Sequence, residues 1–152
     1  MCGIAGILRK DDRNLGHPED ELHAMLQAIR HRGPDNQGVF IQDPIAIGVN
    51  RLSIVDPVQR SNQPMTSPCN RFTIAFNGEI YNFRQLRESL IRQGHVFSTE
   101  SDTDVLLAVY QQNGPQCPSL LRGMFAFAIW DRLSRTLFIA RDRLGEKPLY
   151  FY

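Results

Sequence analysis

The sequence predicts an α+β fold in which helices and antiparallel strands form separate layers. Two observations predict it. The expected strands and helices do not alternate regularly enough for a parallel nucleotide-binding sheet, and several pairs of expected strands are close enough in sequence to form hairpins. The chain has no G-x-G-x-x-G or phosphate-loop motif. At 152 residues, with 42% hydrophobic side chains, it is long enough for one domain with its own core.

Charge and composition exclude several classes of protein. The formal net charge is +1 and the charges are scattered, so we expect no nucleic-acid partner. The apolar stretches are shorter than the roughly 20 residues that cross a bilayer, and no signal peptide is visible, so we expect a cytoplasmic protein without membrane contact. Cys2, Cys69 and Cys117 are then reduced thiols. We expect no metal site, because these cysteines are far apart and lack a neighbouring histidine cluster.

The first half of the chain is expected to contain a strand, a helix and a hairpin. Residues 2–8 (CGIAGIL) are almost all apolar, which predicts a strand buried on both faces. Pro18 opens a helix whose apolar side chains recur along one face. The next expected elements are a loop over 31–38, strands at 38–42 and 45–51, and a long polar loop over 56–70.

The second half is expected to contain two helices between strands. Residues 71–76 predict a strand, and Asn77-Gly78 is typical of a tight turn. Asn82 and Gln85 have the spacing of a capping box, three residues apart, at the start of a helix that Gly94 ends. The remaining expected elements are a short strand at 95–98, a helix capped by Ser101 or Asp102, a hairpin of 123–131 with 136–142, and a last strand at 147–152.

Cys2 is the first candidate for chemistry, because it directly follows the initiator methionine. Removal of that methionine would give one residue both a thiol and a free α-amine. An α-amine titrates near pH ~8 and can act as the general base for the thiol beside it. The alternative is a cysteine that only packs in an edge strand, and position and residue type alone do not decide between the two.

Four further residues suit the recognition of an amide-bearing amino acid. Attack on an amide needs donors for the developing oxyanion, which the Asn77 side chain and the Gly78 backbone can supply. Arg51, at the end of an apolar stretch, can bind a carboxylate, and Asp102, at a helix start, can bind an ammonium group. Taken singly, each also has a structural alternative: a hairpin turn, a surface ion pair or a helix N-cap.

Seven segments then occur together, in this order: MCGIAG, RHRGPD, RLSIVD, NGEIYN, SDTDVLL, GMFAFAIWD and RDRLGEKPLYF. As a set they closely resemble the glutaminase domain of asparagine synthetases, class II glutamine amidotransferases of the N-terminal-nucleophile hydrolase superfamily. The resemblance covers residues 2–152. RLSIVD separates this family from sugar-phosphate and phosphoribosyl amidotransferases, which look different around the arginine.

The resemblance implies a four-layer αββα sandwich, expected to be C-terminally incomplete, and a reaction. Cys2 would attack the side-chain amide of L-glutamine, with its α-amine as general base. Asn77 and Gly78 would form the oxyanion hole, and Arg51 would bind the α-carboxylate. The other residues expected to contact the substrate are Leu52, Ile54, Val55, Glu79 and Asp102, the last two receiving the α-ammonium group.

The resemblance also implies a partner for the product. In the family, ammonia passes to an ATP-dependent synthetase domain that converts aspartate to asparagine, and that domain is absent from these residues. We expect no cofactor in this chain, and ATP and magnesium only in the synthetase domain. Expected partners are a synthetase domain or subunit and a second copy of the chain in a homodimer. The open alternatives are a catalytically inactive module that only pairs with a synthetase subunit, and an amidotransferase with another ammonia acceptor.

Overall fold

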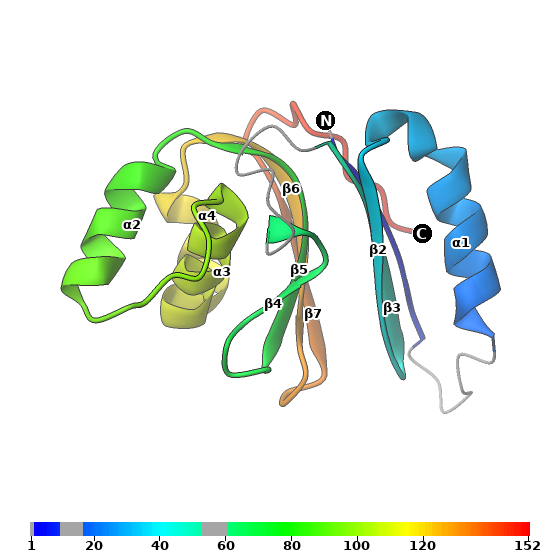
Figure 1. Ribbon diagram of the computed structural model, residues 1–152, viewed down its shortest axis with the longest axis horizontal. Coiled ribbons are helices and arrows are strands. Elements are labelled where there is room, and N and C mark those ends of the chain that lie inside the picture. The colour runs from blue at the N-terminus through cyan, green and yellow to red at the C-terminus, as the bar shows by residue number, and fades with distance from the viewer. Residues whose placement is uncertain (1, 10–16, 53–60) are drawn as a thin grey trace.

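The computed structural model describes residues 2–9, 17–52 and 61–152. They form four layers in the order helix, sheet, sheet and helices, and the two sheets face each other in the centre (Figure 1). This arrangement confirms the expected αββα sandwich. None of the helices in these residues is long and apolar enough to cross a membrane.

The first sheet has three antiparallel strands in the order β1-β3-β2. They are β1 (Gly3–Leu8), β2 (Asn36–Gln42) and β3 (Ile45–Arg51). The register places Gly3 opposite Asn50, so β1 begins where β3 ends. The central strand β3 is buried throughout, whereas in the edge strand β1 only Gly3 is fully buried. Both faces of β1 are nevertheless covered, as expected: Ile4 and Leu8 pack between the sheets, and Ala5 and Ile7 pack on the side of α1. The burial of β1 is only partial, because as an edge strand it has a neighbour on one side only among the described strands.

The second sheet has four antiparallel strands in the order β4-β5-β6-β7. They are β4 (Met65–Thr66), β5 (Phe72–Ile80), β6 (Gly123–Asp131) and β7 (Thr136–Arg141). The expected hairpin of the last two is confirmed. The short strand β4 lies inside the segment expected to be a loop. The expected turn at Asn77-Gly78 is wrong, because β5 continues through both residues and pairs them with Ala126 and Phe125 of β6.

The helices are α1 (Pro18–Ala28), α2 (Phe83–Arg92), α3 (Asp102–Asn113) and α4 (Cys117–Leu120), with 3₁₀ turns at Arg30–Arg32 and Gly114–Gln116. The first 3₁₀ turn and the start of β2 at Asn36 take up most of the loop expected over 31–38. Gly94, at a φ of 91°, follows the end of α2 as expected. No strand forms at 95–98 or at 147–152, so both of these expectations are wrong.

The capping box predicted at Asn82 is also wrong. Asn82 is the N-cap of α2, but its side chain makes no capping hydrogen bond. Its amide instead donates to the carbonyl oxygen of Leu120 at 3.0 Å and accepts from the backbone N–H of Arg122 at 2.9 Å. The side chain therefore joins the start of α2 to the segment that leads into β6.

Three apolar clusters hold the layers together. Leu22 and Leu26 of α1 have no exposed surface and pack on the first sheet. Between the sheets, a second cluster includes Ala75 and Trp130, with Cys2 packed against it. The largest cluster fills the space between the second sheet and the helices α2 and α3. Burial of each large side chain contributes about 1.5–3 kcal/mol, so these clusters hold the start of β1 against the second sheet.

Replacing Gly78 by alanine is expected to destabilise the second sheet by about 3 kcal/mol. A Cβ atom at this position would lie 2.1 Å from the carbonyl oxygen of Met124 and 2.7 Å from Cα of Phe125. Both are backbone atoms of β6, which cannot move away without separating two paired strands. The free energy of unfolding from denaturant titration measures the loss. The control is Gly6→Ala in the edge strand β1, where the nearest atom is the carbonyl oxygen of Ala46 at 3.1 Å. An equal loss in both variants would contradict this explanation.

Candidate active site

A cavity lies where the start of β1, the end of β3, the strand β5 and the start of α3 come together. The residues that line it are Cys2, Arg51, Leu52, Gln63, Phe76, Gly78, Glu79, Ser101, Asp102, Thr103, Met124 and Lys147. Six of the residues expected at the site are therefore brought together: Cys2, Arg51, Leu52, Gly78, Glu79 and Asp102. Ile54 and Val55 lie outside the described residues.

Cys2 is half-buried, directly before β1. Its Sγ lies 3.8 Å from the carbonyl oxygen of Leu52, and its own carbonyl oxygen accepts a hydrogen bond from Nε of Arg32 at 3.3 Å. Apolar packing and this backbone contact hold a chain end that would otherwise fray. The sulfur is thereby fixed at the wall of the cavity.

Asn77 and Gly78 lie side by side in β5. Gly78 lines the cavity, and Asn77 does not. Because side chains alternate along a strand, Asn77 shares the face of Ala75, which packs against the cluster that also contacts Cys2. Asn77 is only 3% exposed, and its buried Oδ1 has no hydrogen-bond partner among the described residues. Oδ1 is an acceptor, so this unpartnered atom does not itself supply an oxyanion donor, and the donor role expected of the Asn77 amide stays a prediction.

Arg51 ends β3 and is 4% exposed. Its Nη1 donates to Oδ1 of Asn62 at 2.8 Å, which fixes one side of the guanidinium group. A guanidinium group presents five donors in a planar fork, a geometry that matches a carboxylate. A buried cation at the cavity wall fits the expectation that Arg51 binds an anionic group.

Asp102 is the first residue of α3 and is 6% exposed. Its Oδ2 accepts a hydrogen bond from the backbone N–H of Ile80 at 3.1 Å. Burial raises the pKa of the carboxyl group to about 6; backbone N–H groups of Ile80 and Thr103 oppose the rise, and the negative charge of Glu79 adds to it. A cation that entered the cavity would lower this pKa again, which makes Asp102 suited to receive an ammonium group.

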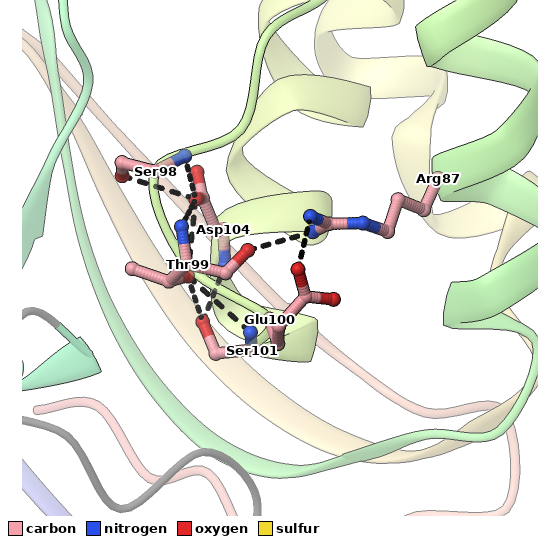
Figure 2. Close-up of polar contacts among 6 residues, drawn as sticks. All are labelled: Arg87, Ser98, Thr99, Glu100, Ser101 and Asp104. Carbon is pink, nitrogen blue, oxygen red and sulfur yellow. Dashed lines mark hydrogen bonds and ion pairs between the residues drawn. The ribbon is translucent and has the colours of Figure 1, made fainter.

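A polar network fixes the start of α3, and hence Asp102 (Figure 2). Ser101 is the N-cap, and its hydroxyl accepts from the backbone N–H of Asp104 at 3.2 Å. The Asp104 carboxylate in turn accepts from the backbone N–H groups of Ser98 and Thr99 and from both of their hydroxyls. The sequence left the cap open between Ser101 and Asp102. The structure assigns it to Ser101, and so Asp102 is not occupied in capping the helix.

Replacing Ser101 by alanine is expected to lower the free energy of unfolding by about 1–2 kcal/mol. The hydroxyl is buried and bonds to both the Asp104 backbone and the Thr99 hydroxyl, so its loss leaves polar groups without a partner. Denaturant titration measures the change. Ser119→Ala, at an exposed position in α4, is the matched control and is expected to change the stability by less than about 0.5 kcal/mol.

Several cavity residues were not predicted from the sequence. Gln63 lies in the segment expected to be a surface loop, yet it is 5% exposed, and Lys147 is 4% exposed. Ser101 was expected only as a cap, and Thr103 and Met124 were not expected at the site at all. No periodic pattern marks these positions, because their burial comes from contacts between segments distant in sequence.

The other two cysteines differ from Cys2 in their surroundings. Cys69 is exposed, and a hydrogen bond with the Ser67 hydroxyl is the main cause of its lowered pKa. Cys117 is buried, which raises its pKa to about 12. Neither lines the cavity. Among residues 2–9, 17–52 and 61–152, no group of three or more His, Cys, Asp or Glu side chains is arranged to hold a metal ion.

Comparisons with known proteins identify close relatives of the whole chain. A family model described as "Glutamine amidotransferase domain" matches residues 1–152. Asparagine synthetase [glutamine-hydrolyzing] 1 of Bacillus subtilis is 45% identical over 152 residues, which are 99% of this chain and 24% of that protein. Putative asparagine synthetase [glutamine-hydrolyzing] 2 of Methanocaldococcus jannaschii is 36% identical over 170 residues, with 100% of this chain and 32% of that protein covered. The chain thus spans about a quarter to a third of the length of these curated relatives.

A solved structure resembles the same fold. Glutamine phosphoribosylpyrophosphate amidotransferase from B. subtilis superposes with a TM-score of 0.69 at 21% identity, over 93% of this chain and 37% of that one. At this identity the match supports the fold alone, and it agrees with the αββα sandwich described above.

Proposed function

The chain belongs to the glutamine amidotransferase domain family and is homologous to the glutaminase part of asparagine synthetases, and from this premise we propose that it hydrolyses the side-chain amide of L-glutamine through a thioester on Cys2. The products are glutamate and ammonia. One observation carries the proposal: Cys2, Arg51, Gly78 and Asp102 come from four separate parts of the chain and line one cavity. A cysteine that only packs in an edge strand would not need an arginine, a glycine and an aspartate around the same cavity.

The cavity suits an amino acid with an amide at the end of its side chain. Arg51 binds the α-carboxylate, and Asp102, with Glu79 beside it, binds the α-ammonium group. The side-chain amide then points toward Cys2. Leu52 lies against the sulfur and contributes a wall of the pocket, for which Ile54 and Val55 are also proposed.

In the first half of the reaction, the α-amine of Cys2 takes the thiol proton and Sγ attacks the amide carbon. An S–C bond forms and the carbonyl oxygen becomes an oxyanion, stabilised by the Asn77 side chain and the Gly78 N–H. The α-ammonium group of Cys2 then protonates the amide nitrogen. The C–N bond breaks, and ammonia leaves behind a thioester.

In the second half, water attacks the thioester carbon and the same α-amine acts as its general base. The S–C bond breaks, glutamate leaves, and the proton returns to the thiol. The cycle consumes glutamine and water and needs no cofactor. A reducing cytoplasm suits this chemistry, because the nucleophile must stay a thiol.

The ammonia is proposed to serve a synthetase domain or subunit that uses ATP and magnesium to convert aspartate to asparagine. The support is that the relatives are named asparagine synthetases and that this chain corresponds to about a quarter of the B. subtilis enzyme. An amidotransferase with another acceptor would leave the glutaminase chemistry unchanged. A homodimer is a separate prediction, which light scattering tests.

Labelling by an electrophilic glutamine analogue tests the proposed nucleophile. The methionine-processed chain is treated with a diazoketone analogue of glutamine, and peptide mass spectrometry locates the adduct. We expect the adduct on Cys2, and glutamine in excess should protect against it. Release of glutamate and ammonia is measured on the same preparation.

The design needs this protection step because Cys69 is exposed and has a lowered pKa. A general thiol reagent such as iodoacetamide is therefore expected to label Cys69 whether or not glutamine is present. Cys117 is expected to stay unmodified in the folded chain. No adduct on Cys2, although mass spectrometry shows Met1 removed, would support the inactive module and overturn the proposal.

A further inference from the structure

Two adjacent residues, Asn62 and Gln63, connect the parts of the cavity that would bind the different ends of the substrate. They lie between β3 and β4, in a segment whose composition suggested a surface loop. Their side chains bond to three different elements. Neither residue was expected at the site.

Gln63 links the oxyanion strand to the helix that carries Asp102. Its Oε1 accepts from the backbone N–H of Phe76 at 2.7 Å, immediately before Asn77. Its Nε2 donates to the Thr103 hydroxyl at 3.2 Å, immediately after Asp102. A side-chain amide can accept at one atom and donate at another without carrying a charge.

Asn62 links the same segment to the proposed carboxylate site. Its Oδ1 accepts from Nη1 of Arg51 at 2.8 Å. The backbone is fixed as well, because a Cβ on Gly38 of β2 would lie 2.1 Å from the carbonyl oxygen of Gln63. The dipeptide thus lies against the first sheet, to which the Asn62 side chain also bonds, while the Gln63 side chain reaches the second sheet and α3.

We propose that Asn62 and Gln63 are positioning residues that set the spacing between the carboxylate, amide and ammonium sites. This inference rests on the proposed binding of glutamine. The three bonds fix Arg51, the backbone beside Asn77, and the start of α3 relative to one another. The substrate has to contact all three at once, so loosening one link should weaken binding even if the fold remains.

The effect on Asp102 passes through Thr103. The backbone N–H of Thr103 stabilises the ionised Asp102 carboxyl group, and the bond from Gln63 holds Thr103 in place. The other charged groups of the cavity are Glu79, Arg51 and Lys147, and a change at the Thr103 hydroxyl leaves all three unaltered. A glutamate at position 63 would add a charge here, so Gln63→Met, which keeps the length and removes both bonds, is the cleaner variant.

Glutamine affinity is measured by titration calorimetry in a Cys2→Ala background, which prevents turnover. Thr103→Val removes only the acceptor for Gln63 and is expected to weaken binding about fivefold to tenfold. Gln63→Met should weaken it further, and the double variant should equal Gln63→Met, because both changes remove the same bond. Thr103→Ser keeps the hydroxyl and should restore the affinity. Thr66→Val, which removes a hydroxyl hydrogen bond to Thr73 in the second sheet, is the matched remote control.

A second measurement does not depend on glutamine. The titration of the Asp102 carboxyl carbon is followed by NMR, and its midpoint should rise in Thr103→Val but not in Thr103→Ser or Thr66→Val. Unchanged affinity and an unchanged midpoint in Thr103→Val and Gln63→Met would overturn the positioning role. If the Cys2→Ala parent binds no glutamine, the proposed function fails, and the midpoint still decides whether the link positions Asp102.

Discussion

An alanine at position 2 is expected to abolish glutamine hydrolysis and leave the fold intact. Without the sulfur there is no thioester route, and the donors that remain cannot supply a nucleophile. Loss of a single nucleophile commonly costs roughly four to six orders of magnitude in kcat. Cys2 is half-buried at the end of the inter-sheet cluster, so the free energy of unfolding should change by about 1 kcal/mol or less. Glutamate release and denaturant titration measure the two quantities.

The controls separate this cysteine and its amine from the other thiols. Cys69→Ala should retain full activity, because that residue does not line the cavity. Acetylation of the Cys2 α-amine should slow hydrolysis by about 10²–10⁴, the usual contribution of a general base. If the acetylated chain stays fully active, another group is the base; if Cys2→Ala stays active, the nucleophile lies elsewhere.

Several residues that line the cavity, including Cys2, Arg51 and Asp102, were predicted from the sequence, because the role proposed for each requires a particular residue type. A terminal cysteine, an arginine and an aspartate at a helix start can be recognised in a linear order. The hairpins were also predictable, since β2 with β3 and β6 with β7 pair over short separations. Local pattern was sufficient where the contacts are local.

The sequence was misleading where long-range pairing overrides a local signal. Asn77-Gly78 has the composition of a turn, but pairing with β6 keeps it extended, and only glycine fits beside the Met124 carbonyl. Asn82 has the spacing of a capping box, but its amide bonds to the segment before β6. Gln63 belongs to a polar stretch that resembles a surface loop, and its burial depends on β5 and α3.

Replacing Asp102 by asparagine is expected to stabilise the fold at neutral pH and to weaken glutamine binding strongly. Burial raises the pKa of this carboxyl group from 3.8 to about 6. The folded state therefore favours the neutral form, and this contribution to stability is complete below pH ~4 and is lost as the pH rises through 6. Asparagine is always neutral and can still accept from the Ile80 N–H. The variant should gain on the order of 2–3 kcal/mol at pH 7, measured by denaturant titration at pH 4 and pH 7.

The same substitution removes the anion that the proposed function assigns to the ammonium group. Glutamine affinity in the Cys2→Ala background should fall about 100-fold at pH 7, because a buried charged hydrogen bond is lost. With Asp102 present, affinity should fall as the pH drops below 6, about fivefold between pH 6 and 5, since the carboxyl group must release a proton to bind a cation. With asparagine this dependence should disappear; Glu79, Arg51 and Lys147 line the same cavity in both proteins. If the variant is more stable but still binds glutamine normally, the ammonium site is assigned to Glu79 alone. If the variant is more stable and no longer binds glutamine, the charged Asp102 carboxyl group lowers the stability of the free protein and is required for substrate binding.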